Sequence, residues 1–140
     1  MKVSTRNVFP GTITKVVKGA VNAEVHLAMQ GGDQIVAGIT NASVDNLGLK
    51  EGASALALVK ASWVILGRDL DGKLSTRNIL NGTVTQVTPG AVNSEVTLKL
   101  SGGTSLTAIV TNASVQNLKI AAGERISAAF KASSVIIAVE

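Results

Sequence analysis

The chain has 140 residues and a formal net charge of +4, with 46% apolar and only 2% aromatic residues. The absence of cysteine excludes a disulfide framework and a thiolate metal site, and the scarcity of aromatic side chains disfavours a surface on which single-stranded bases could stack. For the latter reason we expect no nucleic-acid partner. No apolar run is long enough for a signal peptide or a membrane span, so we expect a cytoplasmic protein with no membrane partner.

The sequence contains the same segment twice, at a constant offset of 71 residues. Ser4-Thr5-Arg6-Asn7 returns as Ser75-Thr76-Arg77-Asn78, and 33 of the 69 positions paired between 1–69 and 72–140 are identical. The repeated blocks are polar or contain glycine, whereas many apolar positions drift. Because a core tolerates apolar exchange, the retained polar residues indicate a chemical demand; a recent duplication with little divergence is the alternative. We predict two domains, a first repeat (1–69) and a second repeat (70–140).

The first repeat consists mostly of predicted strands. Thr12–Val16 and Glu24–Leu27 alternate between apolar and polar residues, as half-buried antiparallel strands do. The pair Gly31-Gly32 predicts a tight turn before a third strand, Gln34–Thr40. Asn41–Leu47 begins with capping residues and predicts a short helix. Two apolar strands are expected after it, at 55–60 and 63–66.

The second repeat has the same layout, with expected strands at 105–111, 126–131 and 135–139 and an expected helix at 112–118. Five short strands with one short helix before the fourth are typical of a small closed barrel of the oligonucleotide/oligosaccharide-binding (OB) type. We therefore predict an all-β fold with two tandem OB-fold-like five-stranded small barrels, each with one short helix. The linker Gly67–Leu74 is short, so the two barrels must pack side by side.

Residues that could support catalysis are few. The one histidine, His26, is replaced by Thr97 in the second repeat, and we expect it to be an exposed strand residue. Glu24 and Glu95 repeat, but isolated carboxylates at that spacing more often pair with a strand neighbour than act as an acid/base couple. No cluster of metal ligands and no phosphate-binding loop is present in the sequence. We predict a protein that is not an enzyme and provides no direct ligands to a metal.

Hydrogen-bond donors repeat instead, in three blocks. Each repeat begins with Ser-Thr-Arg-Asn, has Thr-Asn-Ala-Ser where its helix begins, and ends its fourth strand with Lys-Ala-Ser. Hydroxyls, a guanidinium, an ammonium and main-chain amides are the groups that bind a compact oxyanion. Singly, each block has a structural interpretation as an edge strand, an N-cap or a strand end. Retention of all three in both repeats favours a ligand.

These blocks, together with Gly-Thr-Ile/Val-Thr and Gly-Ala-Val-Asn-x-Glu-Val, closely resemble the molbindins, small molybdate-binding proteins built from Mop domains. The resemblance covers both repeats nearly end to end and implies the form with two tandem domains. It implies a bound molybdate or tungstate with no organic cofactor, and a ring of six domains made by a homotrimer. The oxyanions would lie at interfaces between domains, in a protein serving intracellular molybdenum storage and homeostasis.

The resemblance also implies which residues bind the oxyanion. One pocket would draw on Ser4 and Arg6 of one domain and on a facing domain for Ser43, Lys60, Ala61 and Ser62. The duplicate pocket would use Ser75, Arg77, Ser114, Lys131, Ala132 and Ser133. A second type of oxyanion site near the three-fold axis would use Gly19, Ala20, Val21 and Asn22, with Gly90, Ala91, Val92 and Asn93.

Three other functions remain open from the sequence. A molybdate-sensing interaction module that docks on a transporter or regulator is the first alternative, because Mop domains also occur in such proteins. A nucleic-acid-binding barrel is the second, and strongly salt-dependent binding to an oligonucleotide would favour it. An enzyme comes last.

Overall fold

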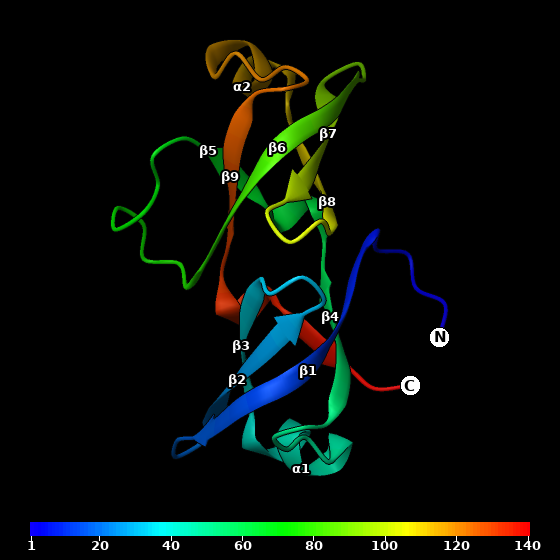
Figure 1. Cartoon of the computed structure of the whole chain (residues 1–140), viewed down its shortest axis with the longest axis vertical. Coiled ribbons are helices and arrows are strands. Elements are labelled where there is room, and N and C mark those ends of the chain that lie inside the picture. Colours follow the sequence, from blue (N-terminus) through cyan, green and yellow to red (C-terminus); the bar gives the residue numbers. More distant parts are fainter.

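The computed structural model describes residues 1–140 and contains two five-stranded antiparallel sheets that follow one another along the long axis (Figure 1). The elements of the first repeat are β1 Asn7–Lys18, β2 Asn22–Met29, β3 Gln34–Thr40, α1 Asn41–Leu47, β4 Ser54–Val59, a 3-10 turn at Ala61–Trp63, and β5 Ile65–Gly67. Those of the second are β6 Asn78–Pro89, β7 Asn93–Leu100, β8 Ser105–Thr111, α2 Asn112–Asn117, β9 Arg125–Phe130, a 3-10 turn at Ala132–Ser134, and β10 Ile136–Ala138. The predicted all-β class with five short strands and one short helix per repeat is confirmed.

The fifth strands are exchanged between the repeats. The strand orders are β10-β4-β1-β2-β3 and β5-β9-β6-β7-β8, so each sheet ends with a strand from the other repeat (Figure 1). Ile65 of β5 pairs with Ala129, and Ile136 of β10 pairs with Leu58. The segment between β4 and β5 contains no glycine, proline, asparagine or aspartate that would reverse the chain into a hairpin. A sequence repeat and a complete sheet are therefore not the same set of residues.

The two helices differ at their ends. Both begin at a threonine cap: the Oγ1 of Thr40 accepts from the Ser43 amide at 3.1 Å, and Thr111 does the same for Ser114 at 3.1 Å. Helix α1 has the predicted bounds and ends at Gly48, whose φ of 64° suits glycine. Helix α2 ends one residue earlier than predicted, at Asn117. Neither α-helix has the length and apolarity needed to cross a bilayer.

One apolar core runs through both halves, because 28 buried side chains form a single contiguous cluster. Each sheet buries one phenylalanine, at different positions of the repeat. Phe9 lies in the first sheet, and its equivalent in the second sheet is Leu80. Phe130 lies in the second sheet, and its equivalent in the first sheet is Val59. The packed volume of the two halves therefore stays similar, although the apolar residues at equivalent positions differ between the repeats.

The asparagine that ends each Ser-Thr-Arg-Asn block joins the two repeats. Asn7 is 1% exposed, and its side-chain amide donates to the carbonyl of Thr107 at 2.7 Å and accepts from the Thr107 amide at 2.8 Å. Asn78 makes the same pair of bonds with Val36, at 2.8 Å each. These side chains take the place of a neighbouring strand for β8 and β3, so retention of asparagine at this position has a structural reason.

The glycine pairs between β2 and β3 and between β7 and β8 also meet. A Cβ on Gly31 would lie 2.1 Å from the carbonyl oxygen of Gly102, closer than any side chain allows. The Gly102 amide donates to Oδ2 of Asp33 at 2.8 Å. The two hairpin turns, predicted only as tight turns, therefore form part of the contact between the repeats.

Candidate functional site

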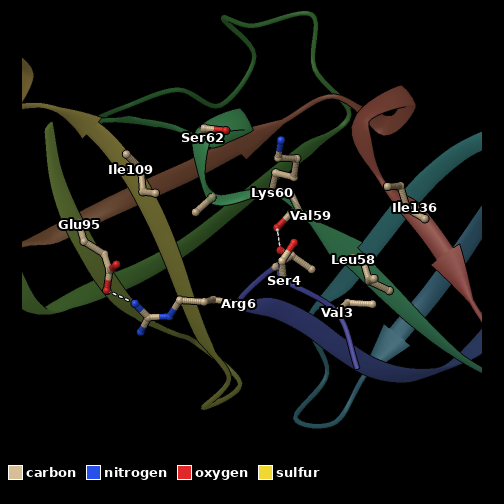
Figure 2. Close-up of a pocket in the computed structure, with 12 residues that line it drawn as sticks. Val3, Ser4, Arg6, Leu58, Val59, Lys60, Ser62, Glu95, Ile109 and Ile136 are labelled. Carbon is tan, nitrogen blue, oxygen red and sulfur yellow. Dashed lines mark hydrogen bonds and ion pairs between the residues drawn. The ribbon is translucent and has the colours of Figure 1, made fainter. Parts of the chain in front are cut away.

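A pocket of about 450 Å³ lies where the chain enters β1 and leaves β4 (Figure 2). We call it the Arg6 pocket, and its lining residues are Val3, Ser4, Thr5, Arg6, Leu58, Val59, Lys60, Ala61, Ser62, Glu95, Ile109 and Ile136. Five of the six residues predicted for the first oxyanion site are in this set. Blocks separated by more than fifty positions in the sequence thus come together in one place.

The two predicted blocks are held together by the β1–β4 pairing. Asn7 pairs with Val59 at the start of β1, and the hydroxyl of Thr5 donates to the Val59 carbonyl at 2.9 Å. This fixes Ser4 and Arg6 beside Lys60 and the 3-10 turn that follows it. Within one chain, a single repeat supplies both blocks to this pocket, because the neighbouring ends of two paired strands bring them together. The division of the donors between facing domains, which the resemblance implies, stays a prediction.

The other repeat supplies the opposite wall of the Arg6 pocket. Glu95 of β7 and Ile109 of β8 are directly paired across the sheet, and both line the pocket. A guanidinium nitrogen of Arg6 donates to Oε1 of Glu95, as the dashed line in Figure 2 marks. Sequence reasoning noted the repeated glutamate but did not place it at the site, since only the fold shows which repeat it faces.

Lys60 is positioned by its own segment. Its ammonium lies over the Trp63 ring, 5.3 Å from the ring centroid, a distance at which a cation and an aromatic face attract. The equivalent of Trp63 is Ser134, so Lys131 has no such partner. The Arg6 pocket therefore has two cations and one carboxylate, with apolar walls from Ile109 and Ile136.

The corresponding ion pair of the second repeat is more extensive. Arg77 donates from both terminal nitrogens to the two oxygens of Glu24, at 2.7 and 2.9 Å. His26 Nε2 also lies 2.8 Å from Oε1 of Glu24. These hydrogen bonds from Arg77, and then that from His26, lower the pKa of Glu24 from 4.5 to about 2, while Glu24 raises the pKa of Arg77.

His26 lies in a strand, as predicted, but the expected exposure is wrong, because its side chain is only 19% exposed. Glu24 covers it, because the two side chains are two positions apart in β2 and therefore point to the same face. The expectation that Glu24 pairs with a strand neighbour agrees with this contact.

The rest of the duplicate set also lies near the boundary between the repeats. The turn Ala132–Ser134 packs against β3, where a Cβ on Gly38 would lie 3.8 Å from the carbonyl carbon of Ala132. Gly38 is the equivalent of Ile109, so this wall lacks a side chain in the second copy. Ser75 precedes β6 beside Arg77, and Lys131 caps the turn.

Ser43 and Ser114 lie outside the Arg6 pocket. Each is bonded to the threonine cap of its helix, with a hydroxyl–hydroxyl distance of 2.9 Å for Ser43 and 2.8 Å for Ser114. Ser114 lines a separate, mostly apolar pocket of about 230 Å³ with Val64 and Ile120. A role for these serines in the same site stays a prediction that needs a second copy of the chain.

The turns predicted for a second type of site lie at the two ends of the molecule (Figure 1). Each turn is closed by a main-chain bond, from Gly19 to Asn22 at 2.7 Å and from Gly90 to Asn93 at 2.8 Å. Val21 and Val92 are 69% and 70% exposed at their tips. None of the residues of these two turns lines the Arg6 pocket, and a three-fold axis there stays a prediction.

Clusters of histidine, cysteine and carboxylate side chains that could hold a metal ion are absent from the chain. The Arg6 pocket instead offers a guanidinium, an ammonium and two serine hydroxyls. Such donors suit an oxyanion that keeps its own oxygens and receives hydrogen bonds from the protein.

Similarity to known proteins agrees with this geometry. Molybdenum transport protein ModE of Herbaspirillum seropedicae is 42% identical over 141 residues, which cover 100% of this chain and 52% of that protein. Molybdenum-pterin-binding protein MopA of Rhodobacter capsulatus is 44% identical over 139 residues, covering 99% of this chain and 52% of that protein. The chain thus spans about half the length of these relatives.

A solved structure covers the whole chain. The cytoplasmic molybdate-binding protein ModG, in a crystal form with molybdate bound, matches with a TM-score of 0.96 and 49% identity over 100% of both chains. The sequence profile of the TOBE domain matches residues 3–66 and again residues 74–137. The predicted tandem of Mop-like domains is therefore confirmed, and the chain belongs to the TOBE domain family, with two copies of the domain in one polypeptide.

Proposed function

We propose that this protein binds molybdate or tungstate in the Arg6 pocket and in its equivalent around Arg77. The observation that carries the proposal is the convergence of Ser4, Arg6, Lys60 and Ser62 around one pocket of about 450 Å³. The match to a molybdate-binding protein over the whole chain supports the choice of ligand. A dianion in this place would gain charge-assisted bonds from the arginine and the lysine, and these would replace its water.

The protein acts as a non-enzymatic binder in the cytoplasm, for storage and homeostasis of molybdenum. Its hydroxyl, guanidinium and ammonium groups are donors that hold an oxyanion. Selectivity against smaller tetrahedral anions follows from pocket size and from how many oxygens the donors reach.

The binding unit is a homotrimer, a ring of six domains. Apolar side chains at the Arg6 pocket support further assembly: Val3, Ile109 and Ile136 are 45%, 40% and 51% exposed, and Trp63 beside it is 41% exposed. Covering this surface with another copy would bury it and would exclude water from the pocket. It could also bring Ser43 of a neighbouring chain toward the oxyanion.

Native mass spectrometry with and without molybdate tests both claims together. Three chains with several bound oxyanions are expected. The double variant Arg6→Ala with Arg77→Ala should lose most of the uptake and keep the oligomer. A charge-matched control, Lys15→Ala with Lys50→Ala, changes two exposed lysines and should bind as the unmodified protein does. Unchanged uptake in the arginine variant would overturn the assignment of the site.

A molybdate-sensing module within a larger regulator or transporter is the second candidate. The observation in its favour is that the chain spans only 52% of ModE from Herbaspirillum seropedicae. Molybdate-dependent co-purification of the chain with a DNA-binding or transport protein would favour this role over storage.

A further inference from the structure

Arg6 and Arg77, the arginines of the two proposed sites, are each paired with a glutamate from the opposite repeat. Arg6 of the first repeat donates to Glu95 of the second, and Arg77 of the second donates to Glu24 of the first. The side chains are 58% exposed for Arg6 and 35% exposed for Glu95, so the contact lies at the mouth of the pocket rather than in the core. Figure 2 shows Glu95 reaching Arg6 from the wall opposite Lys60.

The two glutamates occupy equivalent positions in β2 and β7, and each is bonded to the arginine of one proposed site. An oxyanion that uses the same guanidinium has to compete with a carboxylate that is already bonded to it. Resting on the function proposed above, we propose that Glu95 and Glu24 are built-in competitors that keep the pocket arginines paired and set the oxyanion concentration at which each site fills.

Electrostatics gives the direction of the effect. A dianion and a carboxylate about 6 Å apart repel each other even in water-like surroundings, by an amount equivalent to about a tenfold change in affinity. The carboxylate also neutralises one of the two cations of the Arg6 pocket. Replacing Glu95 by glutamine keeps the size of the side chain and removes both effects, so oxyanion binding should become tighter.

The two competitors are held unequally. Glu95 accepts one hydrogen bond from Arg6, and the residue two positions along its strand is Thr97. Glu24 accepts two bonds from Arg77 and a contact from His26, which occupies the place of Thr97. An oxyanion therefore displaces Glu95 more readily than Glu24. The Arg6 pocket should fill first and the Arg77 site at higher oxyanion concentration. A chain with two such unequal sites would take up oxyanion over a wider range of concentration than a chain with two identical sites.

Isothermal titration of the intact protein with sodium molybdate tests this, with native mass spectrometry to count bound ions. The unmodified protein should show two classes of site. Glu95→Gln should tighten the stronger class about tenfold, and Glu24→Gln should tighten the weaker class by at least as much. Glu51→Gln, which makes the same charge change at an exposed residue outside the pocket, is the control and should leave both classes as they are.

Exchange of the neighbouring residue tests the inequality. His26→Thr gives the first repeat the residue that the second repeat has at Thr97, and it should bring the weaker class about threefold closer to the stronger one. Thr97→His makes the reverse change and should weaken the stronger class. Circular dichroism and the chain count of each variant exclude a folding defect as the cause.

The outcomes separate this inference from the function on which it rests. If the unmodified protein takes up no molybdate, the proposed function is overturned, and the competitor role with it. If it binds molybdate while Glu95→Gln and Glu24→Gln leave the affinities unchanged or weaken them, only the competitor role is overturned. A parallel titration with inorganic phosphate tests the opposite role, in which the glutamate accepts a hydrogen bond from a protonated oxygen of the ligand. Selective loss of phosphate binding in Glu95→Gln would overturn the inference in favour of this ligand-binding role.

Discussion

The side-chain amide of Asn7 forms with Thr107 both of the hydrogen bonds that a neighbouring strand would form, across 100 positions of sequence. Asn78 and Val36 repeat the relationship. The Ser-Thr-Arg-Asn block therefore has two functions. Its serine and arginine line the pocket, while its threonine and asparagine fix the block to the surrounding strands. Retention of the whole block follows from both.

Replacing Asn7 by alanine should lower the free energy of unfolding by about 3 kcal/mol, because it leaves the buried amide and carbonyl of Thr107 without partners. Equilibrium unfolding in urea measures the change. Asn46→Ala, at an exposed position of α1, should stay within about 0.5 kcal/mol of the unmodified protein. Equal effects of the two substitutions would show that the bonds to Thr107 contribute nothing.

Gly31 and Gly32 should respond differently to alanine, although their φ angles are similar at 97° and 101°. At Gly32 nothing lies within 4 Å of the added Cβ, so only the backbone strain remains, about 1 kcal/mol. At Gly31 the Cβ meets the carbonyl of Gly102 at 2.1 Å, and the two turns must separate. Thermal unfolding should therefore show a much larger loss for Gly31→Ala, and similar losses would contradict the close contact between the turns.

Stability should fall in acid because of Glu24. Its pKa is lowered to about 2 in the folded protein from an ordinary value of 4.5, so the ion pair stabilises the fold above pH 4.5 and the contribution is lost as the pH falls from 4.5 to about 2. Since the carboxylate is 35% exposed, screening by solvent limits the effect to about 1 kcal/mol. Urea unfolding of Glu24→Gln between pH 2 and pH 6 should give a shallower decrease. The same slope in both proteins would mean that other carboxylates account for acid unfolding.

Ala23 and Ser94 offer a reciprocal test of one hydrogen bond. Ser94 donates to Oδ1 of Asn112 at 2.5 Å, whereas the equivalent atom of Asn41 is buried without a partner because residue 23 is alanine. Ser94→Ala should cost about 1 kcal/mol, and Ala23→Ser should recover up to about 1 kcal/mol. Urea unfolding of the two variants and of the double variant measures both terms. Destabilisation by Ala23→Ser would show that the position has no room for the hydroxyl.

The predicted elements agree closely with the fold because their signals are local. Alternation marks β2, the Thr40 cap marks the start of α1, and the glycine pair marks the turn before β3. The exchange of β5 and β10 left no such signal, since a strand looks the same whichever sheet it joins. The sequence pattern accordingly assigns the fifth strand of each repeat to its own barrel, whereas the structure pairs it with the sheet of the other repeat.

The sequence predicted part of the candidate site, namely the residues that recur in both repeats. Repetition identified Ser4, Arg6 and the Lys60–Ser62 block, and the structure brings them together in one pocket. The glutamate partner of each arginine was not predictable, because it comes from the other repeat through contacts that depend on the whole fold. Ser43 belongs to a cap within one chain, so its repetition has a local explanation as well.

The exchange of edge strands makes each half of the polypeptide structurally dependent on the other. A protease cut between Gly67 and Leu74 would break the covalent connection, yet the two fragments would remain interlocked through β5 and β10. A fragment produced alone would lack one outer strand and would expose the edge of β4 or β9. It could complete itself only by taking that strand from a second fragment, so an isolated half would be expected to associate with another molecule.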